Sequence, residues 1–565
     1  MKNTGKCHIL LMNLEDASYT PGFLTEYLAF GYLAGSLRSQ GHRVTWLDEY
    51  ASGPYDPENF NFKDYFPVDI VGMSPSFATY RRVLQWLAKW KQYCPGVITV
   101  IGGQHVMLIA REVLMESETV DLICMGEGES PIYYLAENVC KNRNVFDTPG
   151  FAFKDKTHHY HYHENLLEHY PSMDELPFPA RDVLEKWLRQ KRISQVSVQN
   201  SRGCAFNCNF CHFPAIRKRK TSGYNNRSRS PAHVISELVY LQDTYGFREF
   251  FFNSPQFGGI GEAGRKWMRE FAGLLNVLKR DIRFEIECRA DTLNDRELIL
   301  HLKKAGLIRV FLGLEAGYED GLIKFQKGIT IDTQKEIVAA LRSQGISVSG
   351  SGFIMIHPLA GIEGLQKNAE FLWELKETHI NSLWSVFRLF PGIQLNDELE
   401  RRGLVGKDRR HDQVFNYNFM DPRVGKLNAK INVLLSSNLI KLASRLVRLV
   451  DIEINLEEAN LPALYPGVNE IQLRDLLDIR DSGMNLRNTI ITIFFYHFLD
   501  CLKTASREFP LPEWERTGRH LHQNLLNLKS KIDSFLKKHD TCLYSLLRHA
   551  MRKDMRKEVT YERRN

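Results

Sequence analysis

The chain has 565 residues and a net charge of +7, from 74 Lys and Arg against 67 Asp and Glu. This mild excess, without a recognisable reading module, argues against a nucleic-acid partner, and no run of about 18 apolar residues predicts a membrane span. The ten cysteines lack the dense spacing of a disulfide framework, and the N-terminal apolar run is too short for a signal peptide. We therefore expect a cytoplasmic protein of three or four domains, with no membrane or nucleic-acid partner.

Residues 1–145 alternate short apolar runs with segments of helical spacing. Strands are predicted at 8–12, 44–47, 69–73, 97–101 and 122–125, and helices at 24–39, 80–93, 108–115 and 131–139. This alternation is typical of a parallel sheet with helices on both faces. The first domain is therefore predicted to be Rossmann-like.

Ligands of such sheets bind beyond the carboxyl ends of the strands. Ser74 follows the third predicted strand, and Gly102 and Gly103 follow the fourth. No G-x-G-x-x-G motif opens a helix here, which argues against nicotinamide binding. Paired glycines let a bulky ligand approach the backbone, although a tight turn alone would also explain them. His105, directly after these glycines, is interpreted as a turn residue.

Residues 146–190 are predicted to be a linker. Strands at 151–153 and 158–163 suggest a hairpin, and alternation places His159, His161 and His163 on one strand face. We interpret these histidines as a solvated face, in preference to a metal site. A proline-rich segment at 176–179 is expected to be stiff.

The segment S-R-G-C-A-F-N-C-N-F-C-H-F-P begins at residue 201 and holds Cys204, Cys208 and Cys211 at C-x3-C-x2-C spacing. Cysteine thiolates hold iron–sulfur clusters, and a cubane cluster needs four ligands. Three cysteines would leave one iron open for a substrate or cofactor. A zinc site is the alternative, but it usually has a further Cys or His, and His212 follows Cys211 too directly to share one tetrahedral metal.

Residues 191–410 are predicted to form six β/α units. Strands are expected at 195–199, 250–252, 284–288, 309–314, 347–355 and 382–389, with helices at 231–244, 267–278, 295–305, 333–344 and 365–375. The order predicts a partial parallel (β/α)6 barrel with its site at the carboxyl ends of the strands. The polar residues at those ends are Asn253, Arg289, Glu315, Ser349 and Ser351. Ion pairs at the barrel mouth are the structural alternative for Arg289 and Glu315.

Residues 411–565 carry helical patterns at 432–449, 470–477, 489–502, 519–536 and 543–553, separated by prolines such as Pro462. No catalytic motif occurs in them. We expect a helical C-terminal domain.

The motif R-G-C-A-F-N-C-N-F-C resembles the signature of radical S-adenosylmethionine enzymes. The resemblance implies that Cys204, Cys208 and Cys211 hold a [4Fe–4S] cluster, whose open iron binds S-adenosylmethionine and whose electron cleaves it to a 5′-deoxyadenosyl radical. Phe210 matches the aromatic residue that packs near the adenine. The segment G-L-E-A-G resembles the family's G-x-E-S-G, which implies that Glu315 and Arg289 contact S-adenosylmethionine; Asn253 joins them as a strand-end residue.

The segments D-I-V-G-M-S, V-I-G-G-Q-H and G-E-G-E resemble the cobalamin-binding domain that precedes the barrel in one class of these enzymes. The resemblance implies that Ser74, Gly102 and Gly103 lie along the nucleotide tail of cobalamin. The chain lacks the D-x-H-x-x-G motif that provides a cobalt-ligating histidine elsewhere. It also has Ile356 where the family has a glycine, which alters the edge of the predicted site.

The function implied is methylation of an unactivated carbon or a phosphorus, through methylcobalamin and a 5′-deoxyadenosyl radical. The alternatives are a cobalamin-bound cyclase, ring-contracting or rearranging enzyme, and, from another class, a cobalamin or redox sensor. The expected partners are a small-molecule or peptide substrate and an electron donor such as flavodoxin or ferredoxin. Helical tails of this class often close over the barrel mouth.

Overall fold

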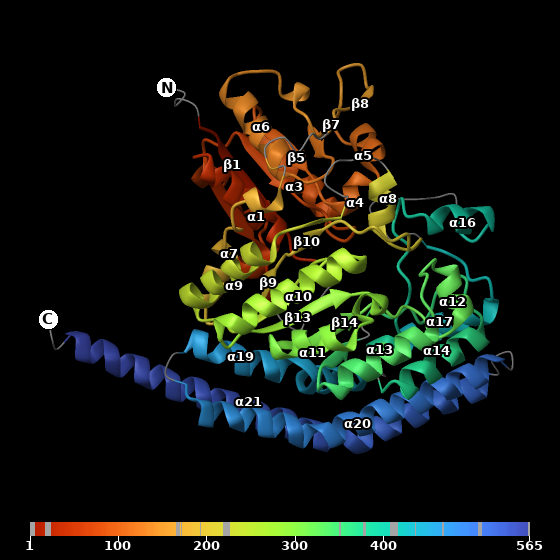
Figure 1. Ribbon diagram of the computed structural model, residues 1–565. Coiled ribbons are helices and arrows are strands. Elements are labelled where there is room, and N and C mark those ends of the chain that lie inside the picture. The colour runs from red at the N-terminus through yellow and green to blue at the C-terminus, as the bar shows by residue number, and fades with distance from the viewer. Residues whose placement is uncertain are drawn as a thin grey trace.

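The computed structural model describes residues 6–16, 24–164, 170, 172–192, 194–218, 226–349, 352–376, 380–406, 416–435, 437–465, 468–506 and 511–562. The chain is arranged in three tiers (Figure 1). An N-terminal sheet with its helices lies at the top of that view, a second sheet with its helices lies in the middle, and long C-terminal helices lie beneath.

The N-terminal sheet has seven strands in the order β3-β1-β4-β5-β6-β7-β8. Its first five strands are parallel, as predicted; they are β3 (Arg43–Asp48), β1 (His8–Asn13), β4 (Ile70–Met73), β5 (Ile98–Ile101) and β6 (Leu122–Cys124). The helices of this tier include α1 (Leu28–Ser39), α3 (Tyr80–Tyr93), α4 (Gln104–Met107), α5 (Ala110–Glu116) and α6 (Glu129–Cys140). All six residues of β1 are buried, because a parallel sheet is covered on both faces.

The hairpin expected in the linker extends this sheet. Its strands are β7 (Phe151–Lys154) and β8 (Tyr160–Tyr162), and β7 pairs antiparallel with β6. His159, His161 and His163 are exposed, as predicted. The rings of His161 and His163 stack against Phe153, with centroids 5.1 and 5.5 Å away. The hairpin therefore covers the open edge of the sheet.

The second sheet has six parallel strands in the order β15-β14-β13-β12-β9-β2. They are β15 (Ser347–Ser349), β14 (Leu307–Leu312), β13 (Arg283–Cys288), β12 (Glu249–Phe252), β9 (Ser194–Val198) and β2 (Leu24–Thr25). Its helices are α9 (Pro231–Tyr245), α10 (Gly261–Leu278), α11 (Arg296–Lys304), α13 (Ile331–Ser343) and α14 (Ile362–Glu374). This is the predicted partial barrel, and the α/β fold class is confirmed.

The two edges of the barrel sheet differ in detail from the prediction. The predicted strand 382–389 is reduced among the described residues to one bridge, between Ile356 and Val386, and α15 (Ile380–Leu383) overlaps its start. At the other edge stands β2, although the sequence pattern placed residues 24 and 25 in a helix. β2 pairs with β9 through Leu24–Ser194 and Thr25–Gln195. The N-terminal chain thus contributes a strand to the second sheet before it enters α1.

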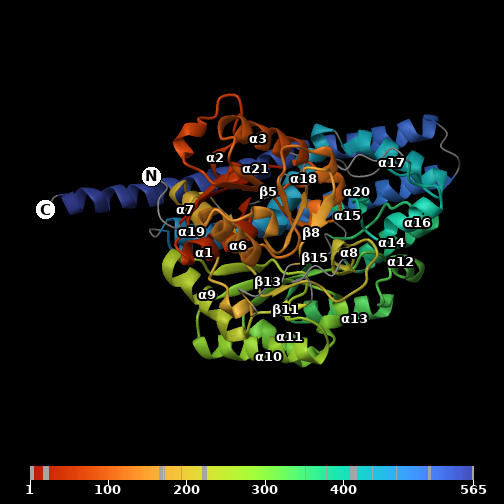
Figure 2. The ribbon, with the colours of Figure 1, turned by 90° about the horizontal axis from the view of Figure 1, so that it is seen from above.

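The C-terminal helices are α17 (Pro422–Leu435), α18 (Asn438–Arg448), α19 (Ile454–Leu464), α20 (Glu470–Ser506) and α21 (Leu511–Glu562), with a π-helical turn at Leu449–Glu453. Pro462 lies inside α19 instead of ending it, and the helices predicted at 470–477 and 489–502 are one helix, α20. Seen from above, the end of α21 projects beyond the body (Figure 2). No helix among the described residues is long and apolar enough to span a membrane.

Helix α19 packs under the barrel, at the amino ends of its strands. The Asn460 amide oxygen accepts a hydrogen bond from the Ser194 backbone N–H at 3.3 Å, at the start of β9. Glu458 accepts one from Arg283 at 2.8 Å, at the start of β13. The resemblance implied a tail over the mouth, but α19 covers the opposite end, and the N-terminal sheet stands above the mouth (Figure 1).

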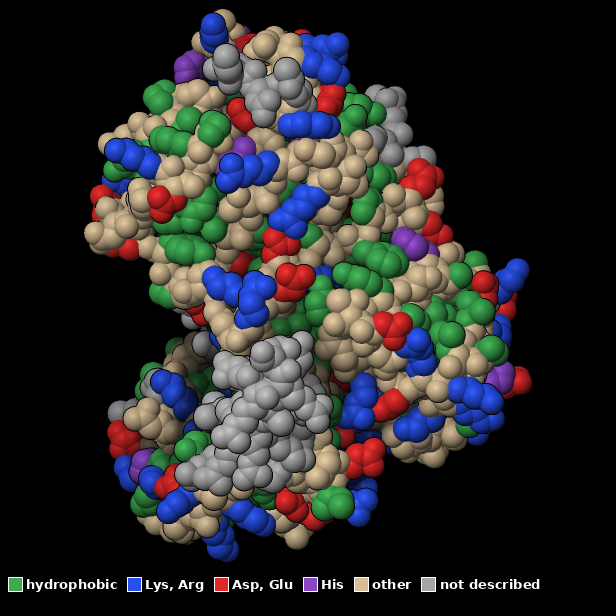
Figure 3. Space-filling view, turned by 90° about the vertical axis from the view of Figure 1, so that its left-hand side faces the viewer, with side chains coloured by type: hydrophobic (Ala, Val, Ile, Leu, Met, Phe, Trp, Pro, Cys, Tyr) green, Lys and Arg blue, Asp and Glu red, His purple; other side chains and the backbone are tan. Residues whose placement is uncertain are grey.

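The surface mixes both signs of charge on the face shown in Figure 3. Lys and Arg side chains there are interspersed with Asp and Glu, and hydrophobic side chains are scattered between them.

Candidate active site between the two sheets

A cavity of about 850 Å³ lies where the carboxyl edge of the N-terminal sheet meets the barrel mouth. Four of the predicted site residues line it: Ser74, Gly102, Gly103 and Asn253. The lining also includes Arg202, Gly203, His212 and Phe213, which flank the cysteine motif. Residues more than 100 positions apart in the sequence therefore meet around one space, which is large enough for a sizeable organic ligand.

The glycine edge of this cavity is built by β4 and β5. Gly103 has φ +102°, and a Cβ added to it would lie 2.6 Å from the Ser74 Oγ. That hydroxyl is itself fixed, because it lies 2.6 Å from the Tyr27 hydroxyl and donates to the Gly102 carbonyl at 3.1 Å. The glycines therefore keep bare backbone at the cavity wall, which is the cradle that a large cofactor needs.

His105 lies in the first turn of α4, directly beyond these glycines. It lines the cavity, and its ring packs edge-on against Tyr80 with centroids 6.0 Å apart. The histidine interpreted as a turn residue thus sits at the start of a short helix.

The cysteine motif forms a loop between β10 (Ser201–Arg202) and α8 (His212–Lys218). Cys208 is buried, whereas Cys204 and Cys211 are half-buried. The Cys211 N–H donates to the Cys208 carbonyl at 3.2 Å, and the Arg217 guanidinium donates to the Cys204 carbonyl. Burial raises the pKa of Cys211 to about 12 and also raises the pKa of Cys204. These thiols are thus neutral without a metal, and a bound iron–sulfur core would displace their protons.

Arg289 reaches the cysteine loop from the end of β13. Its Nη1 lies 3.8 Å from the Cys208 Sγ, and its guanidinium lies 3.9 Å from the centre of the Phe206 ring. Two hydrogen bonds of 2.9 Å join it to Asp291. A cation held against a cysteine sulfur is well placed to stabilise a negatively charged cluster.

Phe210 contacts Phe325 edge-on, with ring centroids 5.2 Å apart. Glu315 has φ +62° and accepts a hydrogen bond from Lys327 at 2.8 Å. A Cβ at Gly313 would lie 2.7 Å from the Glu315 Oε1 and 2.9 Å from the Lys327 Nζ. This buried ion pair explains the first glycine of G-L-E-A-G, and it is the alternative that the sequence left open.

The described cavity lining does not include Phe210, Arg289 or Glu315. Ser349 ends β15, and Ser351 lies outside the described residues.

Glu287 and His212 line the cavity, although neither was predicted as a site residue. Glu287 lies in β13, two positions before Arg289, which directly follows the strand. Its carboxylate makes no hydrogen bond or ion pair with a described residue, and burial raises its pKa to about 7. The period-two series Glu285, Glu287, Arg289 was the available signal. His212 is the second cavity-lining residue that was not predicted, and its ring centroid lies 4.8 Å from that of Phe390.

Arg202 joins the cysteine loop to the N-terminal sheet. It donates hydrogen bonds of 2.7 Å to both Glu127 and Glu129, which follow β6. Arg227 also donates to Glu127, at 3.1 Å. All three partners of the central bridge are largely buried, with side-chain exposures of 12%, 8% and 6%. The G-E-G-E segment therefore fixes one cofactor region against the other.

These features define a class of enzyme: an iron–sulfur protein in which a three-cysteine loop at a parallel barrel mouth faces the ligand edge of a Rossmann-like sheet. Comparison with known families agrees. The radical SAM superfamily model matches residues 199–372, and the B12 binding domain model matches residues 19–136. The chain therefore combines a B12 binding domain with a radical SAM domain, and its cofactors are a [4Fe–4S] cluster, S-adenosylmethionine and cobalamin.

Several known proteins are similar to this chain. Hopanoid C-3 methylase of Methylococcus capsulatus is 26% identical over 350 residues, which cover 59% of this chain and 61% of that protein. Anaerobic magnesium-protoporphyrin IX monomethyl ester cyclase of Cereibacter sphaeroides is 25% identical over 423 residues, which cover 69% of this chain and 62% of that one. The chain thus spans about three fifths of both relatives.

A solved structure has the same fold over nearly the whole chain. The cobalamin-dependent S-adenosylmethionine radical enzyme OxsB, with aqua-cobalamin and S-adenosylmethionine bound, superposes with a TM-score of 0.71. The match covers 96% of this chain and 84% of OxsB, at 16% identity. The likeness therefore includes the helical tail, in which no sequence motif was found.

Proposed function

We propose that this protein is a methyltransferase that acts on an unactivated carbon or a phosphorus of a small molecule. The observation that carries the proposal is one cavity, whose wall is shared by the glycine edge of the N-terminal sheet and by Gly203, His212 and Phe213 beside the cysteines. A methyl group can pass between two cofactors and a substrate only if all three face one space at short range. The similarity to hopanoid C-3 methylase supports this reaction.

The cluster supplies the electron that makes a 5′-deoxyadenosyl radical from S-adenosylmethionine, and cobalamin supplies the methyl group. The chain holds and orients these groups and excludes water. Cys204, Cys208 and Cys211 are the proposed cluster ligands, and Ser74, Gly102 and Gly103 are proposed to lie along the cobalamin tail. Phe210, Asn253, Arg289 and Glu315 are proposed to contact S-adenosylmethionine.

Glu315 would have to leave or share its ion pair with Lys327 to reach S-adenosylmethionine, whereas Arg289 already lies against the cluster loop. We therefore expect Arg289 to matter more for S-adenosylmethionine binding. The proposal also places domain boundaries at residues 145, 190 and 410. It includes a peptide as the alternative substrate and a flavodoxin or ferredoxin as the electron donor, and it places the protein in the cytoplasm. The ten cysteines, all within described segments, form no disulfide.

The test is to incubate reconstituted, reduced enzyme with candidate substrates and to quantify both products of S-adenosylmethionine by mass spectrometry. Methylation predicts one S-adenosylhomocysteine and one 5′-deoxyadenosine for each methylated product. The Cys204→Ala/Cys208→Ala/Cys211→Ala variant should lose iron, sulfide and all 5′-deoxyadenosine, whereas the control Cys542→Ser, on a half-buried cysteine of the tail, should keep them.

A non-methylating reaction is the second candidate, because a cyclase is among the similar proteins. It predicts substrate-dependent 5′-deoxyadenosine without S-adenosylhomocysteine, and that result would replace methylation. A cobalamin or redox sensor predicts neither product.

A further inference from the structure

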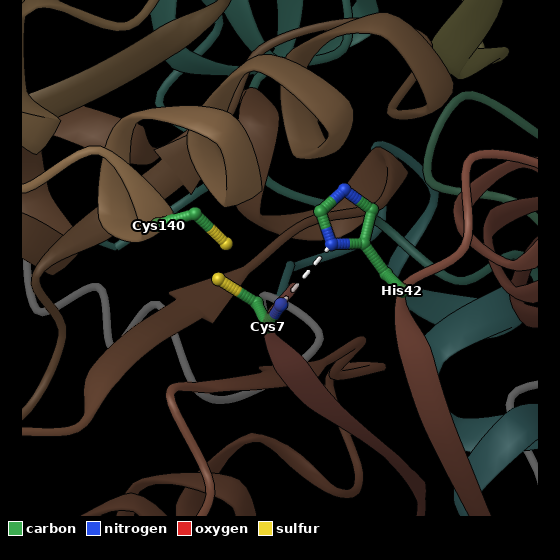
Figure 4. A group of neighbouring side chains, drawn as sticks. All are labelled: Cys7, His42 and Cys140. Carbon is green, nitrogen blue, oxygen red and sulfur yellow. Dashed lines mark hydrogen bonds between the residues drawn. The ribbon is translucent and has the colours of Figure 1, made fainter. Parts of the chain in front are cut away.

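A second cluster of possible metal ligands lies in the N-terminal tier. Cys7 precedes β1, His42 precedes β3, and Cys140 is the last residue of α6. Figure 4 shows the two sulfur atoms pointing toward each other, with the His42 ring beside them. One ligand atom from each residue lies within 4.8 Å of the other two. The described lining of the active-site cavity includes none of the three.

The spacing suits one small ion. Zinc binds thiolate sulfur at about 2.3 Å and imidazole nitrogen at about 2.0–2.1 Å in a tetrahedron, which places its ligand atoms roughly 3.5–3.8 Å apart. The three atoms lie within 4.8 Å of one another, so side-chain rotations would have to bring them closer for one ion to bind all three. Thiolate and imidazole ligands together favour zinc over magnesium or calcium, which prefer oxygen.

The contacts of the His42 ring fix its tautomer. Its Nδ1 accepts a hydrogen bond from the Cys7 backbone N–H at 3.2 Å, so Nδ1 is the unprotonated nitrogen. Zinc would have to replace this hydrogen bond, because the nitrogen has a single lone pair. The Nε2–H is buried and makes no hydrogen bond to a described residue, but the Glu137 Oε1 lies 3.7 Å from it. A ligating histidine usually directs its other N–H at a carboxylate in this way. Burial also lowers the pKa of His42, with Lys6 adding to the effect, which keeps the ring neutral.

The two cysteines differ in burial. Cys7 is only 2% exposed, and its Sγ lies 3.2 Å from the Ala136 carbonyl of α6. Burial raises the pKa of the Cys7 thiol, so it carries a proton in the metal-free protein. Zinc binding would release the two thiol protons to solvent and form two Zn–S bonds, with no change in oxidation state. Cys140 is half-buried, which leaves a path for water.

We propose that Cys7, His42 and Cys140 bind a zinc ion, with water as the fourth ligand and Glu137 holding the histidine. The ion would tie together the starts of β1 and β3 and the end of α6. These segments lie at the end of the sheet opposite the cofactor edge, so the ion would take no part in the reaction proposed above.

The test uses the full-length, cofactor-loaded enzyme prepared without added zinc and then titrated with one equivalent of Zn²⁺. Zinc content is measured by inductively coupled plasma mass spectrometry, and zinc K-edge absorption, which cobalt and iron do not obscure, reports the ligands. We expect one zinc per chain with two sulfur and two nitrogen or oxygen neighbours. Cys140→Ser should lower zinc content at least tenfold, and Glu137→Gln should weaken zinc binding about 10–100-fold. The control Cys94→Ser, on a half-buried cysteine of the same tier, should bind zinc normally.

Three results would overturn the proposal. One is a titrated wild-type protein that binds no zinc. Another is evidence that the ion is bound at the Cys204–Cys208–Cys211 loop or elsewhere. A Cys140→Ser variant that keeps its zinc, or an absorption spectrum with three sulfur neighbours, would be such evidence. The third is a Cys7–Cys140 disulfide in anaerobically prepared protein, found by peptide mapping. Because the wild-type titration and spectrum need no substitution, a variant that fails to fold leaves the proposal testable.

Discussion

The glycine edge of the cavity makes a prediction for two neighbouring residues. Alanine at Gly103 would bring its Cβ to 2.6 Å from the Ser74 Oγ at φ +102°, whereas alanine at Gly102 would meet only the Cys124 Cβ, at 3.3 Å. Gly103→Ala should therefore weaken cobalamin binding by tenfold or more, and Gly102→Ala should weaken it less. Equilibrium binding of hydroxocobalamin, followed by absorbance, measures both. Gly96→Ala, where nothing lies within 4 Å of the added Cβ, is the control; equal losses at all three sites would contradict the argument.

Glu287 makes a pH-dependent prediction. Burial raises its pKa from 4.5 to about 7, so the folded protein keeps a proton that the unfolded chain loses. The stability contributed by this proton is fully present below pH 4.5 and is lost as the pH rises through about 7. At about 1.4 kcal/mol per pKa unit, the loss is at most about 3.5 kcal/mol.

Glu287→Gln removes the ionisation and should stabilise the cofactor-free protein at pH 8 more than at pH 5. Urea unfolding followed by fluorescence at both pH values provides the comparison. Glu297→Gln, on the exposed face of α11, should have the same small effect at both. A Glu287→Gln gain that does not depend on pH would mean that the carboxyl is already ionised in the folded state.

At the scale of the elements, the sequence predicts long periodic segments well and edges poorly. The five parallel strands of the first sheet and the alternating barrel units were evident because buried strands and amphipathic helices have strong periods. The two-residue strand β2 was not evident from the sequence, because its pairing with β9 comes from tertiary contact and not from any pattern in residues 24–25. Pro462 was read as a helix end, yet it is accommodated inside α19.

The candidate site was predictable where chemistry fixes spacing, as in the three cysteines. Ser74, Gly102, Gly103 and Asn253 were placed at strand ends by topology, and they do line one cavity. Pairings between distant side chains could not be predicted. The Lys327–Glu315 ion pair and the Arg202 bridge to Glu127 depend on loops whose paths no local pattern specifies.

The contact between α19 and α21 depends on a buried histidine. His539 is 3% exposed, and its Nε2 lies 2.6 Å from the Glu457 Oε2. Burial alone would lower the pKa of His539, but the hydrogen bond and charge of Glu457 outweigh it and raise the pKa above 6.5. The stability from this pair is fully present below pH 6.5 and is lost as the pH rises through the raised value.

His539→Gln should therefore destabilise the protein by about 1.5–3 kcal/mol at pH 6 and by less at pH 8.5. The midpoint of urea unfolding at the two pH values is the measurement. His522→Gln, on an exposed position of the same helix, is the matched control. A His539→Gln effect that grows with pH would reverse the assignment.

For the molecule as a whole, the Arg202 bridge aligns the cysteine loop with the N-terminal sheet. Arg202→Lys keeps the charge but cannot donate in the same planar fork to Glu127 and Glu129. Both cofactors should still bind, but the yield of methylated product per 5′-deoxyadenosine should fall about 10- to 100-fold, because a displacement of about 1 Å can cost that much. The same product ratio should stay unchanged in the control Arg265→Lys, on a half-buried arginine of α10 that pairs with Glu262. An unaltered ratio in Arg202→Lys would show that the bridge does not set the alignment.

The strand β2 has a consequence for how this protein can be divided. It leaves the N-terminal tier, hydrogen-bonds to the first barrel strand and is followed by Glu26, whose carboxylate pairs with Arg181 at 2.5 Å. A chain shortened to begin near residue 191 would lose this strand and expose the edge of β9, which invites pairing between molecules. Gene fusions that exchange the cofactor tier between relatives should therefore carry residues 24–26 with the barrel, so the natural unit of recombination is discontinuous along the chain.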